Sequence, residues 1–119
     1  MRERIINKVD ITAKSKDELE ALLERTWYDE GYFDFRGVVR EPAGEANLDQ
    51  WRATHWGTTE NADERVTTYR TETQISVEFV TMGEAPTPIF EALREQGYEV
   101  NDFSFDEAEL FELDEEDEL

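Results

Sequence analysis

The first quarter of the chain shows two hydrophobic periods in succession. Apolar and polar residues alternate over Arg4–Thr12, which predicts a β-strand. Leucines at helical spacing line one face of the next segment, which predicts an amphipathic helix from Ser15 to about Trp27. Ser15 and Glu18 stand three residues apart at its start and form the pattern of a capping box, in which each side chain accepts a hydrogen bond from a backbone N–H.

The middle of the chain is rich in aromatic residues and less regular. After an irregular or extended segment, a short helix is expected from Asn47 or Leu48, and Gly57 can end it in a left-handed conformation. Most aromatic side chains here are expected to close over a small sheet as core, with Tyr28 and Tyr32 facing solvent. The aromatic group comprises Trp27, Tyr28, Tyr32, Phe33, Phe35, Trp51 and Trp56.

The second half predicts a hairpin and a helix. Thr, Val and Tyr are frequent in Arg65–Glu72, and apolar residues alternate with polar ones from Ile75 to Phe79. Two paired strands are therefore expected, with a turn near Thr71–Gln74. The helix that follows should be capped by Thr87 and should end before Gly97.

The last predicted strand presents its apolar residues on two faces. Tyr98 and Val100 share one face, whereas Phe103 and Phe105 fall on the other. A β-bulge near residues 101–102 would reconcile the two pairs by turning them toward the same side.

The order of these elements is strand, helix, insertion, strand, strand, helix, strand. This order predicts an α+β, ferredoxin-like domain over residues 1–105: one antiparallel sheet with two helices on one face and an aromatic-rich insertion after the first helix. An acidic tail follows over residues 106–119, interrupted by apolar residues at Leu110, Phe111 and Leu113. Two interpretations of this tail stay open, a solvated appendage and a segment docked on the body.

Charge narrows the classes of partner. The chain has 31 acidic and 12 basic residues, for a net charge of -19. Residues 106–119 hold nine acids and no base, yet residues 1–105 still carry -10, so the excess is distributed. Direct binding to nucleic acid or to an anionic membrane is disfavoured, because both polyanions would be repelled. No apolar run approaches the about 20 residues of a membrane span, and we expect a cytoplasmic protein.

Several short motifs stand in a characteristic order: Asn7-Lys8-Val9, Phe33-Asp34-Phe35, Val38-Val39 with Pro42, Trp51, Trp56-Gly57-Thr58, and a loop from Pro86 to Pro88. They resemble the landmarks of the YubB-type proteins of phages and plasmids. The resemblance implies a ferredoxin-like domain carried by mobile elements, with no established activity and no catalytic residues to transfer. The chain departs from the family pattern at Arg36, where Asn is typical, at Thr59-Glu60, where Lys-Trp is typical, and at Thr81-Met82-Gly83, where a tryptophan is usual.

Residues for catalysis or for a cofactor are sparse. There is no cysteine, and His55 is the one imidazole, better explained by packing or hydrogen bonding beside a helix end than by general-base catalysis. The glycines form neither a Walker-type nor a dinucleotide-binding loop, and the acidic tail lacks the mid-loop glycine of a calcium site. We therefore predict a protein that is not an enzyme, with no catalytic, cofactor-binding or metal-binding residues.

The feature that remains is a stable body covered with carboxylates. Such a surface can place charge where nucleic-acid phosphates would sit in the Lys/Arg groove of another protein. This favours a mobile-element inhibitor of the anti-CRISPR or anti-restriction type, monomeric or weakly dimeric, whose partner is a basic nucleic-acid-binding protein of the host. The expected partner-binding residues are Asp17, Glu20, Glu24, Asp29, Glu30, Asp106, Glu107, Glu109, Glu112 and Asp114.

A second interpretation needs no inhibitory role. In it the chain is a ferredoxin-like protein-interaction domain whose acidity provides solubility or adapts it to high salt. Scarce lysine, three residues against nine arginines, fits salt adaptation, as does the acid excess. A protein of that kind should unfold at low salt through self-repulsion.

Overall fold

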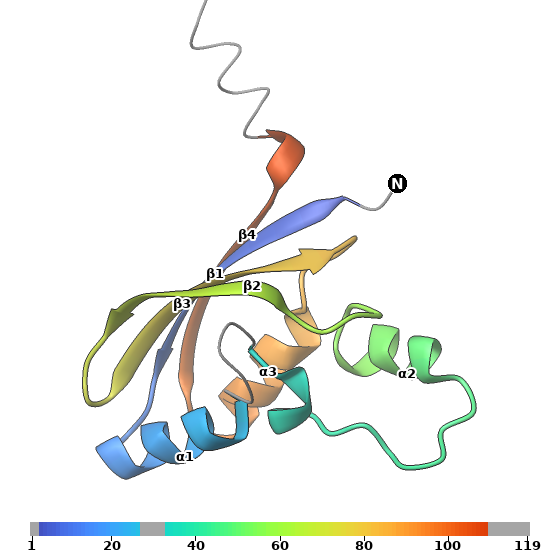
Figure 1. The fold of residues 1–119 in the computed structure, drawn as a ribbon. Coiled ribbons are helices and arrows are strands. Elements are labelled where there is room, and N and C mark those ends of the chain that lie inside the picture. The colour runs from blue at the N-terminus through green and yellow to red at the C-terminus, as the bar shows by residue number, and fades with distance from the viewer. Residues whose placement is uncertain (1–2, 27–32, 110–119) are drawn as a thin grey trace, which may run out of the picture.

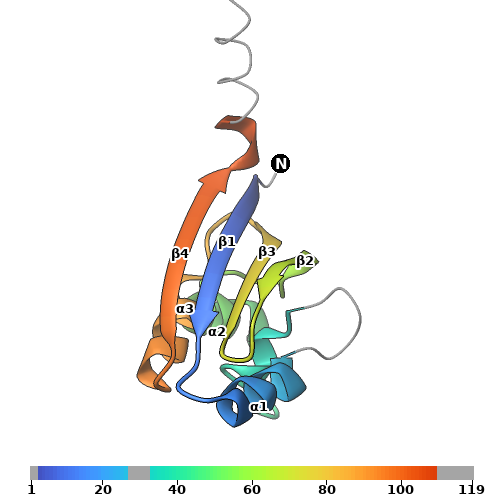
Figure 2. The same cartoon turned by 90° about the vertical axis from the view of Figure 1, so that its left-hand side faces the viewer.

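The structure is a computed structural model that describes residues 3–26 and 33–109. Four antiparallel strands form one sheet in the order β2-β3-β1-β4, and the helical segments lie on one side of it (Figures 1 and 2). The strands are β1 (Arg4–Thr12), β2 (Asp63–Arg70), β3 (Gln74–Met82) and β4 (Glu99–Asp106). The helical segments are α1 (Lys16–Thr26), the 3-10 turn η1 (Phe35–Gly37), α2 (Leu48–His55) and α3 (Thr87–Glu95).

Alternation along the central strands gives the sheet a covered face and an open face. On the covered face Val9 of β1 lies opposite Val77 of β3, and both are buried beneath the helices. On the open face Lys8 lies opposite Glu78 on one side and Phe103 on the other. The period of two predicted for β1 is confirmed, with the bounds expected from the sequence.

A cluster of aromatic rings joins the covered face to the insertion. Phe33 stacks on Phe79 with ring centroids 5.3 Å apart, and Phe35 contacts Phe79 and Trp56 edge-on at 5.8 and 5.7 Å. The prediction that these aromatics form core is confirmed for Phe33, Phe35 and Trp56, which are buried, while Trp51 is half-buried. Three members of the predicted group lie outside the described residues: Trp27, Tyr28 and Tyr32.

The predicted start of α1 and the predicted short helix are confirmed. Ser15 Oγ accepts a hydrogen bond from the Glu18 N–H at 3.2 Å, and the Glu18 carboxylate accepts one from the Lys14 N–H at 3.3 Å. Helix α2 begins after Asn47, whose side-chain oxygen caps it, and Gly57 follows its end with φ of +86°. Local chemistry therefore determines where both helices begin.

The predicted cap of α3 is wrong by one residue. The first carbonyl that accepts helical hydrogen bonds belongs to Pro86, which binds the N–H groups of Ile89 and Phe90 at 3.0 and 3.3 Å. Thr87 is consequently the first helical residue, and its side chain makes no capping hydrogen bond. The end of the helix is as predicted, since Gly97 has φ of +101°.

The bulge predicted near residues 101–102 is also wrong. Strands β1 and β4 pair without interruption from Thr12 opposite Glu99 to Ile5 opposite Asp106. A bulge would have interrupted this ladder of backbone hydrogen bonds. The regular pairing leaves Phe103 and Phe105 on the open face, where the Phe103 side chain is 62% exposed.

The hairpin of β2 and β3 is confirmed, but β2 begins and ends two residues earlier than expected. Its register shifts between Asp63 and Val66 and again between Thr67 and Tyr69, and the content of Thr, Val and Tyr, on which the prediction rested, does not determine such bounds. The turn contains no glycine. Thr71 stabilises it instead, because its Oγ1 accepts a hydrogen bond from the Gln74 N–H at 3.0 Å.

The fold class is α+β, with a four-stranded antiparallel sheet that carries its helices on one side. Between α1 and β2 the chain inserts η1 and α2, so the order of elements is not a strict β-α-β-β-α-β. Within the described residues, no helix combines the length and the apolar character needed to cross a bilayer.

Candidate functional site: the acidic end of the sheet

The start of β1 and the end of β4 meet at one end of the sheet. Ile5 lies opposite Asp106, and Glu3 stands two residues before Ile5 on the same side of the strand, so its carboxyl group reaches that of Asp106. Residues 107–109 continue as a helical turn, whose Ala108 N–H donates to the Asp106 carboxylate at 2.8 Å. We name as the acidic end the group Glu3, Arg4, Asp63, Glu64, Asp106, Glu107 and Glu109.

Arg4 is the one base in the acidic end, and it holds two carboxylates in place. Its Nε donates to Glu107 and its Nη2 to Glu64, each at 2.5 Å. These two hydrogen bonds, with the charges behind them, raise the pKa of Arg4 above its usual range. Arg4 pairs with two of the six acids in this group, so the named residues together keep a net negative charge.

The concentration of charge at the acidic end shifts the pKa of Glu3. Its pKa is raised above the ordinary value of 4.5, first by a hydrogen bond with the Asp106 carboxyl group and then by the charges of Asp106 and Glu109. In the folded chain Glu3 therefore keeps its proton to higher pH than in the unfolded chain. Stability falls as pH rises from the unfolded-chain pKa through the raised one, and the full cost of the repulsion is present above both.

We expect Glu3→Gln to raise the melting temperature at about pH 7 and to leave it unchanged at about pH 3, where the carboxyl groups are protonated in both states. Glu72→Gln, at the exposed hairpin tip away from the acidic end, is the matched control. Thermal melts of the three proteins at both pH values test the expectation. An equal gain at the two pH values would show that charge repulsion is not the cause.

The acids predicted on the first helix do not join the acidic end. Asp17, Glu20 and Glu24 are exposed on α1, at the opposite end of the molecule from residues 107–109 (Figure 1). Glu20 borders a shallow hollow of about 330 Å³ beside the hairpin tip. Two bases line that hollow with it, Lys16 and Arg70. The carboxylates of α1 are therefore partly offset by neighbouring positive charge.

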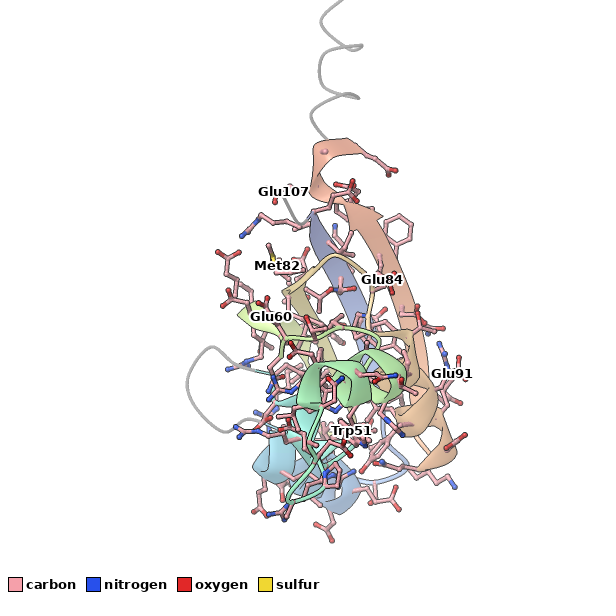
Figure 3. All side chains as sticks on the ribbon, turned by 90° about the vertical axis from the view of Figure 1, so that its right-hand side faces the viewer. Trp51, Glu60, Met82, Glu84, Glu91 and Glu107 are labelled. Atoms are coloured by element: carbon pink, nitrogen blue, oxygen red, sulfur yellow. The ribbon has the colours of Figure 1, made fainter. Side chains whose placement is uncertain are left out.

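The structure thus brings Asp106, Glu107 and Glu109 together. The remaining predicted partner-binding residues lie outside the described residues: Asp29, Glu30, Glu112 and Asp114. Other carboxylates are spread singly over the body, among them Glu60, Glu84 and Glu91 (Figure 3). Sequence reasoning missed Glu3, Asp63 and Glu64, because their positions at this end depend on the pairing of β1 with β4 and of β2 with β3, which the sequence did not specify in register.

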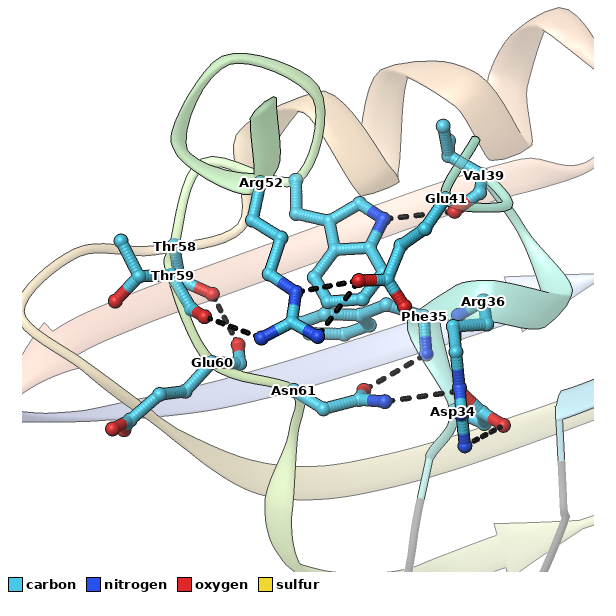
Figure 4. Close-up of polar contacts among 11 residues, drawn as sticks. Asp34, Phe35, Arg36, Val39, Glu41, Arg52, Thr58, Thr59, Glu60 and Asn61 are labelled. Carbon is cyan, nitrogen blue, oxygen red and sulfur yellow. Dashed lines mark hydrogen bonds and ion pairs between the residues drawn. The ribbon is translucent and has the colours of Figure 1, made fainter. Parts of the chain in front are cut away.

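A second cluster of polar side chains, Asp34, Arg36 and Asn61, lies where the insertion meets the sheet, and its members hydrogen-bond to one another (Figure 4). The Asp34 carboxylate accepts from the Arg36 guanidinium at 3.1 Å and from the Asn61 amide at 2.9 Å. Burial raises the pKa of Asp34, but these hydrogen bonds outweigh burial and lower it below the ordinary value. The Asn61 oxygen in turn accepts from the Phe35 N–H at 2.9 Å, so the group supports the fold.

Arg52 ties α2 to the segments on either side of it (Figure 4). Its guanidinium donates to Glu41 at 2.7 Å and to the Thr59 carbonyl at 3.2 Å, and it lies 5.2 Å from the centre of the Trp56 ring. His55 stacks on Trp51 with ring centroids 4.4 Å apart, and its Nδ1 lies 2.9 Å from the Trp51 carbonyl oxygen. These contacts agree with the packing role expected of the histidine.

Among the described residues, no group of three or more acidic or histidine side chains is arranged to hold a metal ion. Comparison with known proteins finds no matching family model, no matching curated protein and no matching solved structure. A proposal about function therefore depends on the residues of the chain itself, and the acidic end is the most distinctive group among them.

Proposed function

We propose that the chain is a non-enzymatic, acidic binding protein of a mobile element that inhibits a host nucleic-acid-binding enzyme by charge mimicry. A concentrated acidic surface of this kind is consistent with an anti-CRISPR or anti-restriction role. The observation that carries the proposal is the acidic end, where neighbouring carboxylates raise the pKa of Glu3. The fold is proposed to be a ferredoxin-like domain of the YubB type with η1 and α2 inserted, and the strand order and antiparallel pairing support this.

The physical basis is the exchange of counterions. Six carboxylates against one guanidinium meet at the acidic end, and the sequence adds six more acids between residues 112 and 118. A Lys/Arg groove that normally neutralises phosphates can neutralise these carboxylates instead, and it then releases its own counterions as it would on nucleic acid. At physiological salt the Debye length is about 8 Å, so carboxylates must be close together to act jointly.

The proposal predicts capture of a basic nucleic-acid-binding protein from host lysate. The immobilised chain should retain it at physiological salt, and excess duplex DNA should displace it. A peptide of matched acidic composition is the background control, since any polyanion collects basic proteins. A version ending at Glu109 keeps the contacts of Asp106 and Glu107 and shows whether residues 110–119 contribute.

Two charge-matched variants locate the binding surface. We expect Glu3→Gln/Glu107→Gln/Glu109→Gln to weaken capture and to reduce its dependence on salt, because counterion release scales with the number of neutralised charges. Asp17→Asn/Glu20→Gln/Glu24→Gln removes the same charge from α1 and should have the smaller effect. Retention no greater than that of the peptide would refute charge mimicry.

The alternative function is a protein-interaction domain whose acidity serves solubility or high-salt adaptation. It is favoured by the carboxylates that lie scattered over the body, on α1 and at Glu60, Glu84 and Glu91. Thermal melts across potassium chloride concentrations separate the two, because a salt-adapted chain should unfold at low salt through self-repulsion.

A further inference from the structure

The open face of the sheet carries an apolar corner next to the acidic end. The register aligns Phe105 of β4 with Ile6 of β1 and Val80 of β3 in one row across the sheet, and Asp63 of β2 ends that row. The next row begins with Phe103, beside Lys8. None of the described helices packs on this face (Figure 1).

Phe103 is an exposed aromatic ring held in a defined position. Its side chain is 62% exposed, whereas Ile6 and Phe105 are half-buried and Val80 is buried. The Phe103 and Phe105 rings lie 5.6 Å apart, and the Lys8 ammonium group lies 5.9 Å from the centre of the Phe105 ring. A regular strand thus fixes the backbone of Phe103, and a supported neighbour limits its side chain. Because the backbone is already ordered, only the side chain loses conformational entropy when a partner covers it.

The charge around this corner indicates what would cover it. Asp63 ends the row of Phe105, and the Arg4–Glu107 and Arg4–Glu64 pairs lie at the strand ends just beyond it. The base beside the ring, Lys8, is paired with Glu78 at 3.6 Å. A partner that buries Phe103 and also reaches the acidic end must therefore present an apolar or aromatic site bordered by Lys and Arg. Proteins that bind single-stranded nucleic acid have this combination, an aromatic platform for unstacked bases beside a basic groove for the backbone. In a duplex the base faces are stacked inside, so a duplex mimic would need charge without an exposed ring.

We propose that Phe103 occupies the position of an unstacked base and that the target is a protein that binds single-stranded nucleic acid. This inference rests on the proposed function and specifies its partner class. Phe103 fills the aromatic site of the target, while the carboxylates of the acidic end occupy the neighbouring phosphate positions.

The test uses the full chain, host lysate and two competitors, oligo(dT) and duplex DNA of equal phosphate concentration. Oligo(dT) should displace the captured protein at a concentration at least about tenfold lower than duplex DNA, and Phe103→Ala should weaken capture at least about tenfold. Phe103→Trp keeps an aromatic face and should retain capture. Tyr69→Ala, which removes a 54% exposed ring from the opposite edge of the open face, should leave capture unchanged.

The outcomes separate this inference from the function on which it rests. Phe103 is exposed, so equal melting temperatures of Phe103→Ala and the unchanged chain will show that a loss of capture is not a loss of fold. Capture that DNA displaces but that Phe103→Ala leaves intact, or that duplex DNA displaces as readily as oligo(dT), overturns the inference and leaves charge mimicry standing. Retention no greater than that of the acidic peptide overturns both.

Discussion

Gly37→Ala is expected to destabilise the protein by about 3 kcal/mol or more, at or above the upper end of typical overpacking costs. Gly37 lies in η1 against the last turn of α1. A Cβ atom there would stand 1.9 Å from the Arg25 carbonyl oxygen and 2.5 Å from its carbonyl carbon. Both atoms belong to the backbone, so no change of rotamer can relieve the overlap. The chain would have to separate η1 from α1.

That separation would break a specific set of contacts. The Arg25 Nε donates to the Gly37 carbonyl at 2.9 Å, and the Asp34 N–H donates to the Thr26 carbonyl at 2.6 Å. The Arg25 guanidinium also donates to Gln96 after α3 at 2.8 Å, so the junction connects both helices with the insertion. Loss of the junction should expose Phe35, which is otherwise fully buried.

Gly44→Ala is the matched control for Gly37→Ala. Gly44 has φ of +79° and no atom within 4 Å of the added Cβ, so its substitution carries backbone strain of about 1–2 kcal/mol and no overlap. Urea unfolding followed by far-ultraviolet circular dichroism gives both free energies of unfolding. A loss for Gly37→Ala no larger than that for Gly44→Ala would contradict the close approach of η1 to α1.

Gly37 also illustrates what the sequence does and does not reveal about the fold. Signals that act within a few residues were read correctly: the alternation of β1, the Ser15 and Glu18 cap, and the left-handed Gly57 and Gly97. The need for glycine at position 37 comes from a carbonyl twelve residues earlier in the chain. No local pattern indicates such a contact.

The errors in the second half have the same origin. The bulge near residues 101–102 was expected because Phe103 and Phe105 were assigned to the same face as Tyr98 and Val100, yet unbroken pairing with β1 left Phe103 on the open face. The register shifts of β2 likewise depend on its partner strand. Pairing between distant segments thus determined both the exposure of Phe103 and the register of β2.

The same distinction applies to the candidate site. Acid-rich composition predicted Asp106, Glu107 and Glu109, which the structure brings together at the acidic end. It did not single out Glu3 and Glu64, whose contacts with Asp106 and Arg4 depend on strand pairing and on the position of β2. Nor could it show that α1 lies at the opposite end of the molecule (Figure 1). Charge can be counted in a sequence, but its concentration requires the fold.

Trp56→Ala is the other substitution with a large expected effect, a loss of about 3–5 kcal/mol in the free energy of unfolding. The Trp56 side chain is 1% exposed and lies edge-on to Phe35 and Trp51, with ring centroids 5.7 and 6.0 Å apart. Its removal would leave a cavity between α2 and the aromatic core. Small domains have about 5–15 kcal/mol of total stability, so this loss could unfold much of the protein.

Trp56→Phe separates the packing of the ring from its hydrogen bond. The Trp56 indole N–H donates to the Val39 carbonyl at 2.8 Å, which joins α2 to the segment after η1. Phenylalanine keeps an aromatic ring against Phe35 but leaves that carbonyl without its donor, and we expect a loss of about 1–3 kcal/mol. Urea unfolding of both variants, with half-buried Trp51→Phe as the control, should rank Trp56→Ala as the most destabilising and Trp51→Phe as the least. Equal losses for the two Trp56 variants would mean that the hydrogen bond, rather than the buried ring, holds the insertion on the sheet.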